Sequence, residues 1–91
     1  MKLYCGHIEC KWTHNSHLEF IYFQQKYGKE LWKALNVAGD ITARRYNSPT
    51  LPGDMYKRVD FYVTIDSTKH ATVFLLKWGW RLDRDRWDLS Q

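Results

Sequence analysis

The feature that most constrains this chain is a strictly alternating stretch around residue 61. Its apolar members are Val59, Phe61, Val63 and Ile65, and the residues between them and beside them are Arg58, Asp60, Tyr62 and Thr64. A period of two places these two sets on opposite faces of a β-strand, which predicts a strand with one dry face and one solvated face. The dry face has to be covered by another apolar element.

That cover is predicted between residues 17 and 38. At about 100° per residue, one apolar stripe forms there from Phe20, Phe23, Tyr27, Leu31, Ala34 and Ala38. Ser16 and Glu19 have the spacing of a capping box, so we expect a helix that begins at His17 and ends before Gly39. Gly28 lies inside this helix at a cost of about 1 kcal/mol relative to alanine. A kink or a break into two shorter helices at Gly28 is the alternative.

Three further segments are predicted to be strands: residues 3–12, 40–46 and 71–80. In the first, alternation places Tyr4, Ile8, Cys10 and Trp12 on one face and Cys5, His7, Glu9 and Lys11 on the other. Residues 47–54 are rich in turn formers and predict a loop, and residues 66–70 predict a turn. The strand over residues 71–80 should therefore form an antiparallel hairpin with the alternating strand before it.

These elements predict one α+β domain. A chain of 91 residues is too short for two independent cores, so the domain covers residues 1–91, with residues 82–91 as an extended edge or a flexible end. The order is β-α-β-β-β, with a four-stranded, mainly antiparallel sheet and one long amphipathic helix packed on one face. The predicted core consists of Phe23, Tyr27, Leu31, Phe61, Val63, Ile65, Val73 and Leu75.

The densest reactive chemistry lies in residues 5–17, which contain both cysteines and three of the four histidines. Zinc takes four nitrogen or sulfur ligands in a tetrahedron, and the candidate ligands are Cys5, His7, His14 and His17. A small zinc-stabilised domain is thus one hypothesis. However, the cysteine and histidine pairs lack the connecting element that zinc fingers have. We therefore expect reduced thiols, exposed histidines and no cofactor.

Catalytic signatures are missing from the sequence. The five glycines form neither a dinucleotide-binding loop nor a P-loop. Cys5 and His7 form a nucleophile–base pair only if a cationic or helix-terminal environment stabilises the thiolate, and nothing in the sequence indicates one. We therefore predict that the chain is not an enzyme.

Basic and aromatic residues form the predicted binding site. The net charge is +4, from 14 basic and 10 acidic residues. Pairing around the loop of residues 47–54 would bring two arginines beside Lys57 and Arg58, which is unfavourable unless an anion or acidic groups share the charges. The predicted binding residues are Arg44, Arg45, Tyr46, Lys57, Arg58 and Tyr62. They form either a stacking, cationic site for single-stranded nucleic acid or a solvated face that Asp54 and Asp60 neutralise.

The preferred functional prediction is a non-catalytic protein that binds another protein and modulates it, most simply by inhibition. Aromatic residues make up 16% of the chain, a share that fits either rings on the surface for a partner or a small core filled by large side chains. The sequence shows no secretory signal and no membrane span, so we expect a cytoplasmic chain without a membrane partner. Compact chains of this kind are typical of accessory or inhibitory proteins of phages and mobile elements. A nucleic-acid-binding module is the alternative.

Overall fold

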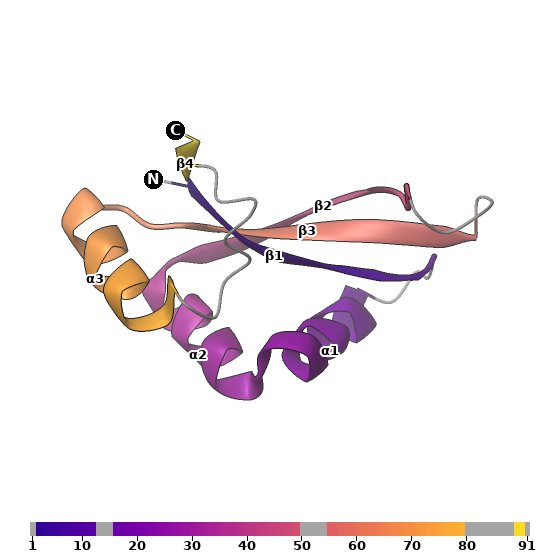
Figure 1. Cartoon of the computed structure of the whole chain (residues 1–91), viewed down its shortest axis with the longest axis horizontal. Helices are drawn as coiled ribbons and strands as arrows, with labels where there is room; N and C mark the ends of the chain where they lie inside the picture. Colours follow the sequence, from indigo (N-terminus) through magenta and orange to yellow (C-terminus); the bar gives the residue numbers. More distant parts are fainter. Residues whose placement is uncertain (1, 13–15, 50–54, 80–88, 91) are drawn as a thin grey trace.

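A computed structural model describes residues 2–12, 16–49, 55–79 and 89–90. In chain order its elements are β1 (Lys2–Lys11), α1 (Ser16–Tyr27), α2 (Lys29–Ala38), β2 (Asp40–Asn47), β3 (Tyr56–Thr64), α3 (Thr68–Trp78) and β4 (Leu89–Ser90). They form one small α+β domain, which confirms the predicted fold class (Figure 1). The predicted tail, residues 82–91, lies outside the described residues except for β4.

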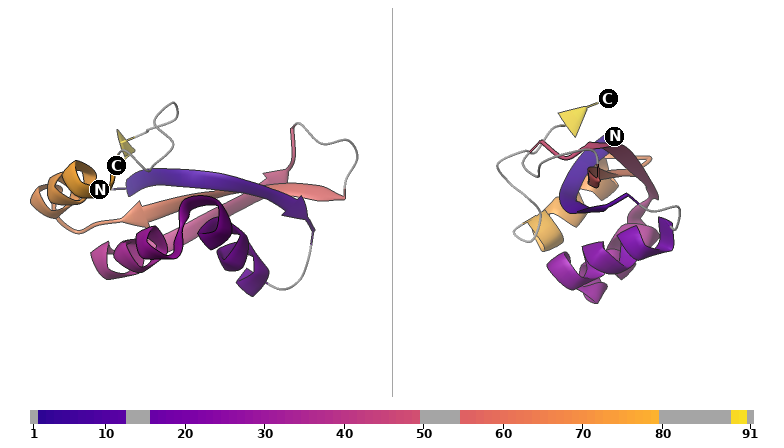
Figure 2. Two further views of the ribbon diagram at one scale, coloured as in Figure 1. Left: turned by 60° about the horizontal axis from the view of Figure 1, so that its bottom comes forward. Right: turned by 90° about the vertical axis from the view of Figure 1, so that its right-hand side faces the viewer.

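The sheet is antiparallel, with the strand order β2-β3-β1-β4. Its long strands are β1, β2 and β3, whereas β4 contributes only two residues, opposite Lys2 and Leu3. The helices α1 and α2 lie on one side of the sheet (Figures 1 and 2). We call that side the helix face and the opposite side the outer face.

The single helix predicted over residues 17–38 is wrong, and the alternative break at Gly28 is confirmed. Gly28 adopts φ 103° and ψ 148° between α1 and α2. This region of positive φ is strained for residues with a side chain, so glycine is the residue that permits the turn. The Gly28 amide still donates to the carbonyl of Gln24 at 2.8 Å, which closes the last turn of α1.

The strand predicted over residues 71–80 is also wrong, because α3 occupies this segment. The Ser67 hydroxyl caps the helix by accepting the amide of His70 at 3.0 Å. Ala71, Phe74, Leu75 and Trp78, spaced at helical intervals, pack against the core. A short apolar run does not distinguish a buried strand from a buried helix, which explains the error. Val73, assigned to the core, faces outward with 58% exposure.

A β-bulge at Cys5 corrects the predicted faces of β1. Tyr4 lies opposite Tyr62 and Gly6 lies opposite Phe61, so Cys5 is the extra residue. The bulge shifts the alternation by one position. Leu3, Cys5 and Ile8 therefore face the core, with Cys10 packed against it. The prediction that Tyr4 shares a face with Ile8, and Cys5 with His7, is wrong for this reason.

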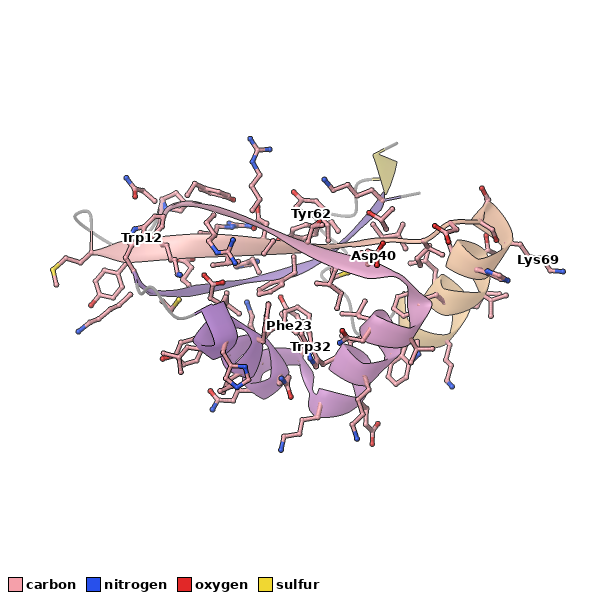
Figure 3. All side chains as sticks on the ribbon, turned by 180° about the vertical axis from the view of Figure 1, so that it is seen from behind. Trp12, Phe23, Trp32, Asp40, Tyr62 and Lys69 are labelled. Carbon is pink, nitrogen blue, oxygen red and sulfur yellow. The ribbon has the colours of Figure 1, made fainter. Side chains whose placement is uncertain are left out.

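The core lies between the helix face and the helices. Phe23, Leu31 and Leu35 from the helices meet Val59, Phe61 and Val63 from β3, all fully buried. The ring centroids of Phe23 and Phe61 lie 4.7 Å apart, and those of Phe23 and Trp32 lie 5.4 Å apart. Figure 3 shows Phe23 and Trp32 next to each other between the sheet and the helices. The predicted core is thus confirmed for Phe23, Leu31, Phe61, Val63 and Ile65, with Tyr27 and Leu75 packed at its border. Among the described residues, no helix is both long and apolar enough to span a membrane.

Candidate functional site

The outer face is the main candidate site, and the strand register defines it. Residues that pair across antiparallel strands share a face. One row across β2, β3 and β1 on this face consists of Arg44, Asp60 and His7. The next row on the same face consists of Tyr46, Arg58 and Glu9. The row of Thr42, Tyr62 and Tyr4 adjoins them. In Figure 3, Tyr62 lies on the side of the sheet away from Phe23 and Trp32.

A buried carboxylate, Asp60, organises this face. Arg58 donates from Nε to Asp60 Oδ1 at 2.9 Å, and the Tyr46 hydroxyl donates to Oδ2 at 2.7 Å. The Tyr4 hydroxyl lies 3.5 Å from Oδ1, accepts from Arg58 Nη2 at 3.3 Å and lies 3.2 Å from Nδ1 of His7. The network fixes three side chains around one charge.

Arg58 remains charged within this network, although it is only 7% exposed. Burial lowers the pKa of its guanidinium, but the hydrogen bonds and charge of Asp60, together with Tyr4, outweigh burial and raise the pKa above its ordinary value. The positive charge of Arg58 is therefore already paired inside the chain.

Tyrosine rings surround this network, with Tyr4 buried and Tyr62 half-buried. Tyr62 meets Tyr4 edge to face at a centroid distance of 5.5 Å, and Lys2 Nζ lies 4.7 Å from the centre of the Tyr62 ring. Tyr46 and Tyr56 are also partly exposed. The outer face thus combines rigid aromatic surface with hydrogen-bonding groups.

A second ionic cluster lies on the helix face, where Glu19 of α1 meets Arg45 and Lys57. Arg45 donates from Nε to Glu19 Oε2 at 2.8 Å and from Nη2 to Oε1 at 2.6 Å, while Lys57 Nζ donates to Oε2. Glu19 is fully buried and Lys57 is 1% exposed. Burial raises the pKa of Glu19, but its two cationic partners outweigh burial and hold it below the ordinary value.

The six predicted binding residues are therefore divided between two faces. Arg44, Tyr46, Arg58 and Tyr62 lie on the outer face, whereas Arg45 and Lys57 lie on the helix face. Arg44 and Arg45 pair with Asp60 and Val59 instead of with Lys57 and Arg58. Asp60 pairs with Arg58, but both side chains are buried and not solvated as that hypothesis expected, while Asp54 lies outside the described residues.

The predicted zinc ligands are not brought together where the structure describes them. Cys5 faces the core, and burial raises its pKa to about 12, although a hydrogen bond at Val63 opposes this. His7 lies on the outer face and His17 is exposed in the first turn of α1, while His14 lies outside the described residues. Within the described ranges, no group of three acidic, cysteine or histidine residues is placed to hold a metal ion.

Two surface grooves are formed among the described residues. One, of about 730 Å³, lies between β1 and α1 and is lined by residues that include Glu9, Cys10 and Tyr22. The other, of about 270 Å³, lies on α3 between Val73, Phe74 and Trp78. Burial raises the pKa of the Cys10 thiol and outweighs the opposing charge of Lys57, so the thiolate of Cys10 is disfavoured.

The Glu19 cluster was missed at the level of the sequence, although one signal was present. Lys57 has the same parity as Val59 and Phe61, so alternation places a lysine on the dry face of β3. A charge at such a position requires a buried partner. Nothing in the sequence identified that partner, because Glu19 fitted a capping box.

Comparisons with protein-family models, with curated proteins and with solved structures found no match.

Proposed function

We propose that this chain is a non-catalytic protein that binds another protein through its outer face and thereby modulates it, most simply by inhibition. The observation that carries the proposal is the pair of half-buried tyrosines, Tyr46 and Tyr62, held on the outer face by Asp60 and by the buried Tyr4. Tyrosine rings provide large, amphipathic contact area with few rotatable bonds, and they are enriched where proteins meet.

The order of this face supports tight contact. Binding costs free energy when side chains lose rotamer freedom. The hydroxyl of Tyr46 is already bonded to Asp60, and Tyr62 already packs against Tyr4, so little further ordering is needed. α1 and α2 pack on the opposite side, so neither helix covers the tyrosines (Figure 2).

The charges favour a protein over nucleic acid as the partner. Of the four predicted binding cations, Arg45 and Lys57 pair with Glu19, and Arg58 pairs with Asp60. A phosphate backbone would have to compete with these internal pairs, whereas protein interfaces accept a mixed, largely neutralised face.

Nucleic-acid binding remains the second candidate because Arg44, Tyr46 and Tyr62 share the outer face with Lys2. In that case, binding of a single-stranded oligonucleotide should weaken log-linearly with salt, with a slope of about −0.7 per phosphate contacted. Absence of any binding at low salt would exclude this candidate.

The main test is affinity capture from a lysate of the cells in which the chain is naturally produced. Wild type and Lys69→Ser, a change of an exposed side chain on α3, should retain one protein in stoichiometric amount. Tyr62→Ser should lose it while keeping a native circular dichroism spectrum. Diffuse background in every lane, or equal capture by Tyr62→Ser, would refute the proposal. The activity of the captured protein is then measured with and without the chain.

A further inference from the structure

The open edge of β2 is a second surface suited to a partner. Among the described strands, β2 pairs only with β3 and therefore forms one border of the sheet. The amide of Ser48 donates to the carbonyl of Tyr56 at 3.1 Å, in line with the register of β2 and β3. Along an antiparallel strand, the backbone N–H and C=O groups of successive residues point alternately to the two sides. The N–H and C=O groups of Thr42, Arg44 and Tyr46 therefore point toward β3. The N–H and C=O groups of Ile41, Ala43 and Arg45 point away from β3, toward the open edge.

We propose that this edge binds an extended acidic segment of a protein partner as an added antiparallel strand. The inference rests on the proposed function, since it specifies how a partner protein is engaged. Strand addition draws affinity from backbone hydrogen bonds and specificity from alternate side chains. The edge of β2 offers eight residues for such pairing, from Asp40 to Asn47.

The arginines of β2 select for acidic residues. The Arg44 side chain is exposed on the outer face, and within the described part of the chain it forms no ion pair. Its cross-strand neighbour Asp60 is engaged by Arg58 and Tyr46. Arg45 is 37% exposed on the other face, and its bonds to Glu19 use only Nε and Nη2. An added strand therefore meets the cation of Arg44 on its outer face and, on its other face, the guanidinium of Arg45, whose charge Glu19 already pairs.

The remaining positions specify apolar and neutral residues. Ile41 and Ala43 are half-buried on the helix face and pack against the core, so apolar side chains opposite them would extend it. Thr42 lies between them on the outer face and suits a threonine opposite. A partner strand that runs antiparallel to β2 passes Arg45 first and Ile41 last. From its N-terminal end it should therefore carry two acidic residues opposite Arg45 and Arg44, an apolar residue opposite Ala43, a threonine opposite Thr42 and an apolar residue opposite Ile41.

A second copy of this chain fits the edge less well than an acidic segment. Two-fold antiparallel pairing of β2 with itself centred on Arg44 or Arg45 would oppose like charges, which destabilise pairing. Pairing centred on Ala43 would place Arg44 opposite Thr42 and Arg45 opposite Ile41, so neither arginine would meet an acidic residue. The edge of β1 is also less suitable, because the outward backbone of His7 is already met by Tyr27 and Lys26, at 3.1 Å and 2.8 Å.

The test is an NMR titration of the full chain with the peptide acetyl-Thr-Asp-Glu-Val-Thr-Val-Thr-amide, with amide hydrogen exchange as the second readout. We expect binding with slowed exchange at Ile41, Ala43 and Arg45. A peptide with lysines in place of both acidic residues should not bind. Ala43→Pro should abolish binding without unfolding the chain, because its amide points away from β3 and proline is tolerated on edge strands.

Charge variants complete the test. Arg44→Glu should weaken binding about tenfold, since it replaces attraction by repulsion, whereas Lys33→Glu makes the same change on the exposed side of α2 and should leave binding unchanged. Absence of peptide binding up to about 1 mM, or equal binding by Ala43→Pro, would overturn strand addition. Neither result affects the outer-face proposal, which the capture experiment with Tyr62→Ser tests independently.

Discussion

The buried ion cluster at Glu19 gives the sharpest prediction about stability. Glu19→Gln removes the negative charge that Lys57 and Arg45 share, while it retains the size and shape of the side chain. Lys57 is 1% exposed, so its charge is left buried without a carboxylate partner. Breaking one partner of a buried pair in this way costs about 3–5 kcal/mol.

This cost is a large part of the stability expected for a domain of 91 residues, which is about 5–14 kcal/mol. Arg45 differs from Lys57 because its side chain is 37% exposed and reaches water. Arg45→Met should therefore cost only about 1 kcal/mol. Most of the free energy of unfolding that Glu19→Gln loses therefore comes from the unpaired charge of Lys57. Adding Lys57→Met to Glu19→Gln removes this charge and should recover about 1–3 kcal/mol.

Urea unfolding followed by circular dichroism measures these values. Glu30→Gln, an exposed position on α2, is the matched control and should change the free energy of unfolding by less than about 0.5 kcal/mol. The reasoning is refuted if Glu19→Gln behaves like Glu30→Gln, or if the effects of Glu19→Gln and Lys57→Met simply add.

Three further predictions concern pH, the helix break and the thiols. Folding lowers the pKa of Glu19, so the unfolded chain binds more protons than the folded chain near pH 4. The free energy of unfolding should therefore fall as the pH is lowered below about 4, and it should fall less in Glu19→Gln. Gly28→Ala should lower the free energy of unfolding by about 1–3 kcal/mol because φ is positive there, whereas Lys29→Ala should have little effect in the same urea experiment. With the pKa of Cys5 near 12, a Cys10→Ser variant should not react with a thiol reagent at pH 8 until urea unfolds it; prompt labelling of the folded variant would contradict the buried placement of Cys5.

The parts of the fold that the sequence predicted are those with a long, unambiguous period. Strict alternation identified β3 and its buried residues, and the stripe at helical spacing identified residues 17–38 as helical. The stripe predicted one helix, whereas the break at Gly28 was an alternative that rested on the glycine. The prediction for the segment of α3 failed because its apolar run is compatible with both periods; in the structure the segment is capped by Ser67 and packs Ala71 and Phe74 into the core.

Local irregularity limited the prediction of the candidate site. The bulge at Cys5 moves Tyr4 to the outer face and Cys5 into the core, and one inserted residue is not visible in the pattern of alternation. The register also decides that Arg45 and Lys57 meet Glu19, a contact between residues far apart in the chain. Such contacts depend on tertiary packing, which no local pattern of residues encodes.

Hydrogen–deuterium exchange of the chain in complex with its captured partner tests the central claim most directly. We predict protection in β2 and β3 on binding, with the outward side of α1 and the groove on α3 unchanged. Protection confined to the α3 groove between Val73 and Trp78 would contradict the assignment of the outer face as the binding surface.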